Sequence, residues 1–187
     1  MKPLILVKHS LPEIVEAIPA REWTLSEKGR QRARKLAELL IPYQPGAIAC
    51  SVEPKARETA AILADNLGLA MQLVQGLHEH DRRASPYHSR EDFQKLVQEF
   101  FEKPNMLVFG SETAAQSLAR FREAVGSVLK SFEDKIIVIV AHGTVISLFV
   151  SWLTGCDGYT LWQKLGLPSF VLIDMESREL VKIENLP

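Results

Sequence analysis

Residues 136–144 of this 187-residue chain read Ile136-Ile137-Val138-Ile139-Val140-Ala141-His142-Gly143-Thr144. The five β-branched residues that open this stretch predict a strand covered on both faces, as in the centre of a parallel sheet. A helix follows from Gly143, because the apolar residues between Val145 and Trp152 recur at helical spacing. The stretch therefore predicts a buried strand and a helix with a histidine at their junction.

The amino-terminal part of the chain repeats this arrangement. Leu4–Val7 is a second apolar run, and Lys8-His9-Ser10 follows it directly. In a parallel α/β sheet, ligands bind beyond the carboxyl ends of the strands. If the two strands are neighbours, His9 and His142 meet at that end of the sheet. Either histidine alone has an equally good structural explanation, but the repetition favours a functional site.

Apolar periodicity divides the rest of the chain into alternating strands and helices. Further strands are expected at 47–51, 70–77, 169–174 and 179–184, and further helices are expected to begin near residues 24–27, 54, 89 and 110–112. This alternation predicts an α/β fold, a three-layer α/β/α sandwich around a mostly parallel sheet with an antiparallel edge strand. No internal repeat or flexible linker divides the sequence, so residues 1–187 are expected to form a single domain.

The composition is that of an ordinary globular protein. Hydrophobic residues make up 47% and charged residues 24%, which excludes a disordered or fibrous protein. Lysine plus arginine (22) nearly balance aspartate plus glutamate (23), so we expect neither nucleic acid nor a membrane as a partner. Two cysteines are too few for a disulfide framework. The sequence shows no signal peptide and no apolar run of about 18 residues, so a cytoplasmic location is expected.

Two further polar clusters follow predicted strands. Lys55 and Arg57 fall in the first turn of a predicted helix, where they either bind an anion at the helix N-terminus or remain solvated surface charges. The sequence His78-Glu79-His80-Asp81 follows the strand expected at 70–77. Its side chains either ligate a metal or supply one acid among residues that have no catalytic role.

Together these motifs resemble those of the histidine phosphatase superfamily, also called phosphoglycerate-mutase-like. Lys8-His9-Ser10 resembles its Arg-His-Gly motif, and Ala141-His142-Gly143 resembles its second histidine motif. Four further segments match family motifs. Leu25–Gly29 resembles the Leu-Thr-x-x-Gly helix start, and Ser51–Ala60 resembles the Ser…Arg-Ala…Thr-Ala motif. Leu77–Glu79 resembles the Leu-x-Glu motif, and Gly110–Thr113 together with Arg120 resembles the Gly-Glu-Ser…Arg segment. Each motif alone is weak, but all of them occur in the family's order.

The resemblance implies an enzyme that hydrolyses phosphate monoesters through a phosphohistidine on His9, with no metal or cofactor. It assigns the proton donor to Glu79, with Asp81 as the alternative acid, and it places His142 in the same catalytic site. His9 must then be neutral, with a hydrogen bond at one ring nitrogen that leaves the other nitrogen free. Glu79 must stay protonated near neutral pH, which burial or a nearby anion can arrange.

On the same resemblance, Lys8, Lys55 and the N–H of Gly143 bind the phosphate. The family has arginine at both lysine positions, and Ser10 replaces a glycine or alanine. An ammonium group is a point charge and cannot hold two phosphate oxygens in one plane as a guanidinium does. Each hydrogen bond lost in this way costs about 1.5–3 kcal/mol. The pocket therefore fits either an active phosphatase or a catalytically weak module that binds a phosphorylated ligand.

Residues 82–109 correspond to the small substrate cap of the family. Arg82 and Tyr87 there, together with Arg57, are candidate contacts for the part of the substrate beyond the phosphate. The compact length favours a phosphatase over a phosphoglycerate mutase-type phosphotransferase, and the expected substrate is a small-molecule phosphate ester or a phosphoprotein. A metal hydrolase built on the histidines and acid of residues 78–81 is a further alternative.

Overall fold

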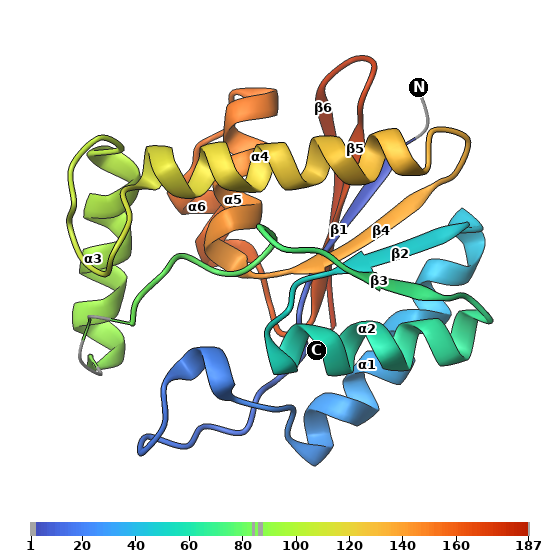
Figure 1. Ribbon diagram of the computed structural model, residues 1–187, viewed down its shortest axis with the longest axis horizontal. Helices are drawn as coiled ribbons and strands as arrows, with labels where there is room; N and C mark the ends of the chain where they lie inside the picture. The colour runs from blue at the N-terminus through green and yellow to red at the C-terminus, as the bar shows by residue number, and fades with distance from the viewer. Residues whose placement is uncertain (1–2, 84, 86–87, 187) are drawn as a thin grey trace.

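The computed structural model describes residues 3–83, 85 and 88–186, and within them a six-stranded sheet lies between layers of helices (Figure 1). The strands are β1 Leu4–Lys8, β2 Ala47–Cys50, β3 Met71–Leu73, β4 Ile137–Ala141, β5 Ser169–Asp174 and β6 Glu179–Asn185. Their order across the sheet is β3-β2-β4-β1-β5-β6. The first four of these run parallel, whereas β5 pairs antiparallel with both β1 and β6. The predicted α/β class is confirmed, with a hairpin at the antiparallel edge.

Strand β4 lies between β1 and β2, and each of its residues is buried. Its parallel register pairs Leu4 with Ile137 and Lys8 with Ala141, so that β1 and β4 end at the same level. The N–H of His9 then donates to the carbonyl of Ala141 at 3.0 Å. The prediction that these two strands are neighbours is confirmed.

Helices cover both faces of the sheet (Figure 1). They are α1 Glu27–Leu40, α2 Pro54–Leu67, α3 Arg90–Glu102, α4 Ala114–Ser131, α5 Gly143–Thr154 and α6 Gly158–Lys164, with 3₁₀ turns η1 Ala20–Glu22 and η2 Ile41–Tyr43. Alternation along β1 directs Leu4 and Leu6 toward α4 and α5, and Ile5 and Val7 toward α1 and α2. None of the helices in the described part of the chain is long and apolar enough to cross a membrane.

The third strand is shorter than the sequence pattern predicts. Instead of residues 70–77, β3 contains only Met71–Leu73, all exposed at the edge of the sheet. Beyond it, the guanidinium of Arg120 donates to the carbonyls of Gly76 and His78, which a strand would offer to its neighbour. Gly76 has a φ of 90°, and a Cβ there would lie 2.9 Å from a side chain of α4. The chain therefore leaves the sheet and packs against α4.

α1 begins at Glu27, within the expected range, and the hydroxyl of Ser26 accepts a hydrogen bond from its first turn. Other helix starts differ from the sequence prediction. α4 begins after Thr113 rather than at 110–112, because Thr113 and Gln116 form a capping box. The sequence pattern does not predict α6, which Asp157 caps.

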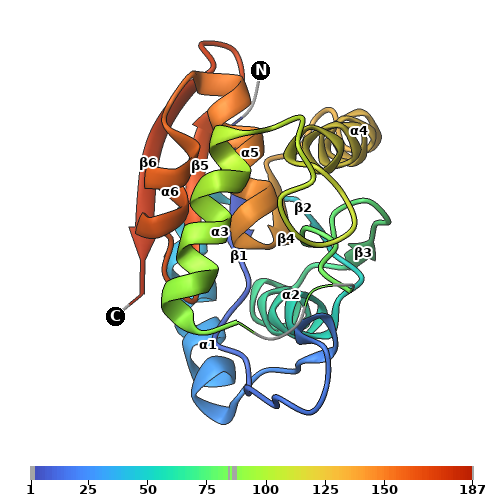
Figure 2. The same cartoon turned by 90° about the vertical axis from the view of Figure 1, so that its left-hand side faces the viewer.

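Helix α3 packs against α6 and forms a small apolar core apart from the sheet (Figure 2). Val97, Phe100 and Phe109 are buried in it. The Ser89 hydroxyl caps α3, as the sequence predicts. The three buried residues belong to 82–109, the segment expected to form the substrate cap, and the core is completed by residues of α4, α5 and α6.

Candidate active site

His9 and His142 directly follow β1 and β4, and their rings lie in contact beyond the carboxyl ends of these strands. The ring centroids are 5.1 Å apart, with 62° between the ring planes. Both side chains are buried, His9 with 8% exposure and His142 with none. The predicted convergence of two histidines that are remote in sequence is confirmed.

Hydrogen bonding assigns the tautomer of His9. Its Nδ1 lies 2.8 Å from the carbonyl oxygen of Ser10. A carbonyl can only accept, so Nδ1 carries the hydrogen and Nε2 keeps a lone pair. Burial lowers the pKa of His9 well below its usual value, and His142 and Lys55 act in the same direction. The ring is therefore neutral near pH 7.

Ser10, which differs from the family motif, anchors the loop after β1. Its hydroxyl donates to the carbonyl of Gly29 at 2.7 Å, and its N–H donates to Oγ1 of Thr59 at 3.0 Å. The Thr59 hydroxyl in turn donates to the carbonyl of Lys55 at 2.7 Å. Ser10 therefore ties the His9 loop to α1 and α2, and its hydroxyl is already engaged.

His142 is the N-cap residue of α5. Its Nε2 lies 2.8 Å from the hydroxyl of Ser51, at the end of β2. Its Nδ1 lies 3.7 Å from Oε2 of Glu53 and has no hydrogen-bond partner among the residues that the structure describes. Burial lowers the pKa of His142 well below its usual value, and Lys55 adds to this effect. The ring is thus neutral, with one nitrogen facing a carboxylate.

Glu79 lies at the N-terminus of α5. Its carboxylate accepts hydrogen bonds from the N–H groups of His80, Thr144 and Val145 at 2.9 to 3.3 Å. Burial acts to raise the pKa of Glu79, but the charge of Arg82 and the N–H of His80 contribute to a net lowering. The expectation that Glu79 is protonated near neutral pH is therefore wrong for this structure, because the charge of Arg82 and the N–H of His80 stabilise its ionised form.

Lys8 reaches the site across the start of α5. Its Nζ donates to the carbonyl of Leu165 at 2.8 Å, and a Cβ at Gly143 would lie only 3.1 Å from its Cε. Glycine at this position leaves room for the lysine side chain, which a larger residue would crowd. Burial lowers the pKa of Lys8 to about 8, against the opposing charge of Glu79. Lys8 is therefore mostly charged at neutral pH.

Lys55 also reaches the site, where its Nζ already has two acceptors. It donates to the carbonyl of Ala20 and to Oε2 of Glu53, both at 2.7 Å. Lys55 and Glu53 are each less than a tenth exposed. An ammonium has three hydrogens, so one donor of Lys55 remains for an incoming anion. Sequence reasoning missed Glu53, whose place in the site depends on the fold and not on spacing.

The other predicted site residues are placed differently. Arg82 is partly buried, lies over the ring of Phe93 at 4.8 Å, and influences the pKa of Glu79. Arg57 is exposed on α2 and lines a surface groove beside β3. Asp81 accepts a hydrogen bond from the side chain of Arg83, which lowers the pKa of Asp81 to about 2. Asp81 is therefore ionised at neutral pH. Tyr87 lies outside the described residues.

Arg120 clamps the segment that carries Glu79. Its guanidinium donates to the carbonyls of Gly76, His78 and Glu79 at 2.7, 2.9 and 3.3 Å. The carboxylate of Glu112 accepts from the same guanidinium at 2.6 Å. The sequence motif contains both charged residues, but only the fold shows that they hold the backbone of the acid.

His80 is a packing residue in this fold. It is 3% exposed and lies between the rings of Phe100 and Phe109, with centroid distances of 4.2 and 4.6 Å. Its Nε2 faces the carbonyl of Glu112 at 3.1 Å. Within residues 3–83, 85 and 88–186, no three His, Cys, Asp or Glu side chains are grouped so that they could hold a metal ion. The metal-site alternative has no support here.

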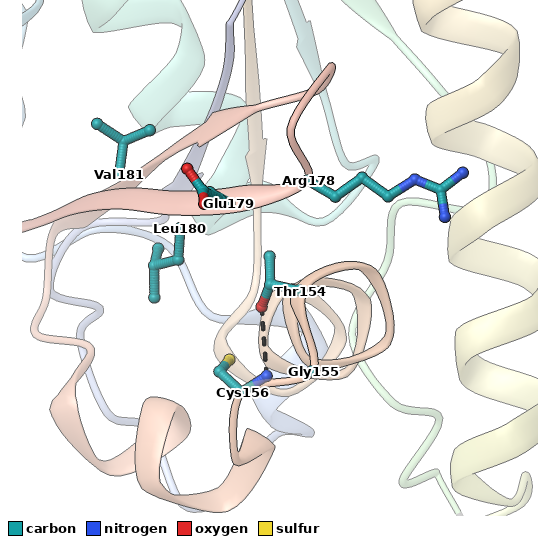
Figure 3. Close-up of a pocket in the computed structure, with 7 residues that line it drawn as sticks. All are labelled: Thr154, Gly155, Cys156, Arg178, Glu179, Leu180 and Val181. Atoms are coloured by element: carbon teal, nitrogen blue, oxygen red, sulfur yellow. Dashed lines mark hydrogen bonds between the residues drawn. The ribbon is translucent and has the colours of Figure 1, made fainter.

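A cavity of about 510 Å³ lies elsewhere, between the end of α5 and the start of β6 (Figure 3). It is lined by Thr154, Gly155, Cys156, Arg178, Glu179, Leu180 and Val181. The sheet register places β6 residue 179 beside the amino end of β1, opposite the histidines. This cavity is therefore separate from the histidine site.

The sequence profile of the histidine phosphatase superfamily (branch 1) matches residues 5–183. The chain belongs to this superfamily. The profile covers both histidine segments and the segment of Glu79. No curated protein matches this chain by sequence.

Solved structures of phosphatases share the fold of this chain. A mutant phosphoserine phosphatase from Entamoeba histolytica in complex with phosphoserine has a TM-score of 0.80 and 18% identity, covering 98% of this chain and 97% of its own. A mycobacterial glucosyl-3-phosphoglycerate phosphatase has a TM-score of 0.75 and 22% identity, covering 91% and 89%. The α-ribazole phosphatase of Shigella flexneri has a TM-score of 0.73 and 17% identity, covering 98% and 96%.

Proposed function

We propose that the protein hydrolyses phosphate monoesters through a phosphohistidine on His9. The observation that carries this proposal is the neutral, buried His9 ring, whose Nε2 keeps a lone pair while Nδ1 donates to a carbonyl. A neutral imidazole with one free nitrogen is the form that can attack phosphorus. Membership of the histidine phosphatase superfamily agrees with this chemistry.

The positive groups around the histidines would offset the charge of the ester phosphate. Lys8 and Lys55 bring two ammonium groups to the site, and the N-terminus of α5 at Gly143 adds the positive end of a helix dipole. His142 would turn its Nδ1 toward the phosphate. These contacts matter most as Nε2 of His9 forms its bond to phosphorus and the ester P–O bond breaks.

Glu79 would supply the proton that the leaving oxygen needs. Its carboxylate is ionised in this structure, so it must gain a proton as the ester binds. A dianion placed beside the carboxyl group raises the pKa of Glu79, because like charges disfavour ionisation. In the second step water attacks phosphorus, the N–P bond breaks, and the Glu79 carboxylate takes the proton from the water.

The substrate class that we propose is a small-molecule phosphate ester. The structural neighbours named above are phosphatases, and two structures of the Entamoeba enzyme contain phosphoserine or 3-phosphoglyceric acid. Residues 82–109 would cap the substrate, with Arg82 beside its non-phosphate part. A phosphoprotein is the alternative substrate, and a panel that includes both classes distinguishes them.

A second candidate function is binding of a phosphorylated ligand without turnover. The observation that favours it is that both lysine Nζ groups already donate to protein acceptors, Lys8 to Leu165 and Lys55 to Ala20 and Glu53. If these contacts persist, fewer donors reach the phosphate than two arginines would supply.

A phosphatase panel on the native protein and on the Lys8→Arg/Lys55→Arg variant separates the two functions. We expect the native protein to release phosphate from small esters, and the double variant to do so at least about tenfold faster. Even one regained charged hydrogen bond to phosphate is worth about 1.5–3 kcal/mol, and about 1.4 kcal/mol is tenfold in rate. Lys130→Arg, near the end of α4, is the matched control. Phosphate binding without release by either protein would support the binding module instead.

The role of Arg120 gives a prediction of its own. Because its guanidinium holds the Glu79 segment, Arg120→Lys should misplace the acid and slow alkyl phosphates about tenfold. Aryl phosphates leave as phenolates and should slow by less than about twofold. Arg122→Lys, on the same helix over Trp152, is the control. The measurement is kcat for both ester classes. Equal slowing of both would show that Arg120 stabilises the fold and does not position Glu79 for proton donation.

A further inference from the structure

Glu53 is an acidic side chain within the proposed phosphate pocket. It is the N-cap residue of α2, but its side chain makes no capping hydrogen bond to that helix. Instead, Oε2 lies 2.7 Å from Nζ of Lys55 and 3.7 Å from Nδ1 of His142. Oε1 accepts from the N–H of Glu79 at 2.9 Å. The carboxylate therefore contacts three residues to which the proposed function gives roles.

The ring nitrogen that faces Glu53 is otherwise unsatisfied. Nδ1 of His142 is buried and has no hydrogen-bond partner among the described residues, whereas Nε2 is engaged by Ser51. Unsatisfied buried polar atoms are rare and call for an explanation. The Ser51 hydroxyl can donate to Nε2, which leaves Nδ1–H directed toward an acceptor. At 3.7 Å the Glu53 oxygen is too distant to make that hydrogen bond well.

A phosphate oxygen would need the same partners. To act on an ester at His9, Lys55 and His142 must each direct a donor at the phosphate. Oε2 of Glu53 now accepts from Lys55 at 2.7 Å and lies 3.7 Å from Nδ1 of His142. A carboxylate and a phosphate are both anionic acceptors, so they compete for the same donors. Two anions in one buried pocket also repel each other.

We infer that Glu53 is an internal competitor of the substrate phosphate, and this inference rests on the proposed function. The Glu53 carboxylate must leave Lys55 before the phosphate can bind fully. The carboxylate stands where a phosphate oxygen would bridge Lys55 and His142. Glu53 therefore sets the phosphate affinity of the site, and it does so by weakening it. In return it keeps the buried ammonium of Lys55 paired when no ester is bound.

The test is binding of inorganic phosphate, measured by titration calorimetry on the native protein and on Glu53→Gln. Glutamine keeps the size of the side chain and an acceptor for the Glu79 N–H, but it loses the charge. We expect Glu53→Gln to lower the phosphate Kd at least about tenfold, equivalent to about 1.4 kcal/mol. Binding is a better readout than turnover, because the charge of Glu53 also raises the pKa of Glu79.

Glu58→Gln is the matched control. Glu58 lies on the same helix and loses the same charge, but its carboxylate pairs with Arg30 at 3.0 Å and accepts from the N–H of Leu25. We expect its phosphate Kd to stay within about twofold of the native value, because this partly exposed carboxylate is engaged by Arg30 and not by a phosphate-binding residue. A gain of equal size in both variants would overturn the inference, since net charge alone would then explain it.

The remaining outcomes are also decisive. If the native protein binds phosphate and Glu53→Gln binds it no more tightly, the inference is overturned while the proposed function stands. If no protein binds phosphate, both are overturned. Should Glu53→Gln fail to fold, crystals of the native protein with inorganic phosphate supply the answer. We expect Glu53 to have moved beyond hydrogen-bond distance of Lys55, and an unbroken pair beside bound phosphate would refute the inference.

Discussion

His9→Ala lowers phosphatase turnover by at least about 10³-fold, which corresponds to about 4 kcal/mol of barrier. The expected loss is this large because alanine removes Nε2, the atom that would bond to phosphorus, and no other group in the site can replace it. His142, the nearest imidazole, has its Nε2 engaged by Ser51 and its Nδ1 facing Glu53. Turnover is measured on an aryl phosphate, so that proton donation does not limit the rate.

The same variant should also lose the covalent intermediate. Acid quenching of the native protein during turnover of a labelled ester should trap an acid-labile phosphoryl group, and His9→Ala should trap none. His88→Ala, which removes a histidine bonded only to Ser85 in the described structure, is the control and should keep the label. An undiminished label in His9→Ala would exclude His9 as the nucleophile.

Glu79→Gln slows alkyl phosphates by about 10²- to 10⁴-fold, the usual range for loss of a general acid. Aryl phosphates should lose less than about tenfold, because a phenolate leaves without much help from a proton. Glutamine keeps the size of the side chain and one acceptor oxygen, so it can retain the hydrogen bond that Thr144 donates to Oε2 or the one that Val145 donates to Oε1, and it loses the other. The measurement is the ratio of kcat for an alkyl and an aryl ester.

Asp81→Asn is the comparison for Glu79→Gln. The pKa of Asp81 is about 2, so this carboxylate has no proton to give near neutral pH, and its loss should leave the ratio of alkyl to aryl turnover within about twofold of native. A ratio that changes in Asp81→Asn and not in Glu79→Gln would assign the acid to Asp81. Equal slowing of both esters by Glu79→Gln would exclude Glu79 as the donor to the leaving group.

Most of the fold and the centre of the site could be predicted from the sequence. A run of β-branched residues at 136–140 predicts the buried strand β4, and the similar run at the amino terminus predicts its neighbour β1. These predictions succeed because strand burial depends on the local apolar pattern. Once the two strands are adjacent and parallel, His9 and His142 must lie at the same end of the sheet.

Features that depend on tertiary contacts were not predictable in the same way. The pattern at 70–77 is typical of a strand. However, Arg120, more than 40 residues later, donates hydrogen bonds to the carbonyls that would otherwise extend the strand pairing. The carboxylate of Glu79 accepts hydrogen bonds from N–H groups of α5, which lie more than 60 residues later in the chain. Glu53 differs from an ordinary surface acid only because the ends of β2 and β4 bring it to His142.

The pairing of Lys8 with Ala141 has a consequence for how enzymes of this kind can diversify. Neighbouring strands lie about 4.8 Å apart, and the two histidines directly follow the paired strands β1 and β4. The spacing of the strands therefore determines how far apart the two imidazole rings begin. Insertions or exchanges in the stretch 82–109 cannot alter that dimension. If this stretch caps the substrate as proposed, grafting it from a relative is expected to change which phosphate ester is bound and to leave the spacing of the two histidines unchanged.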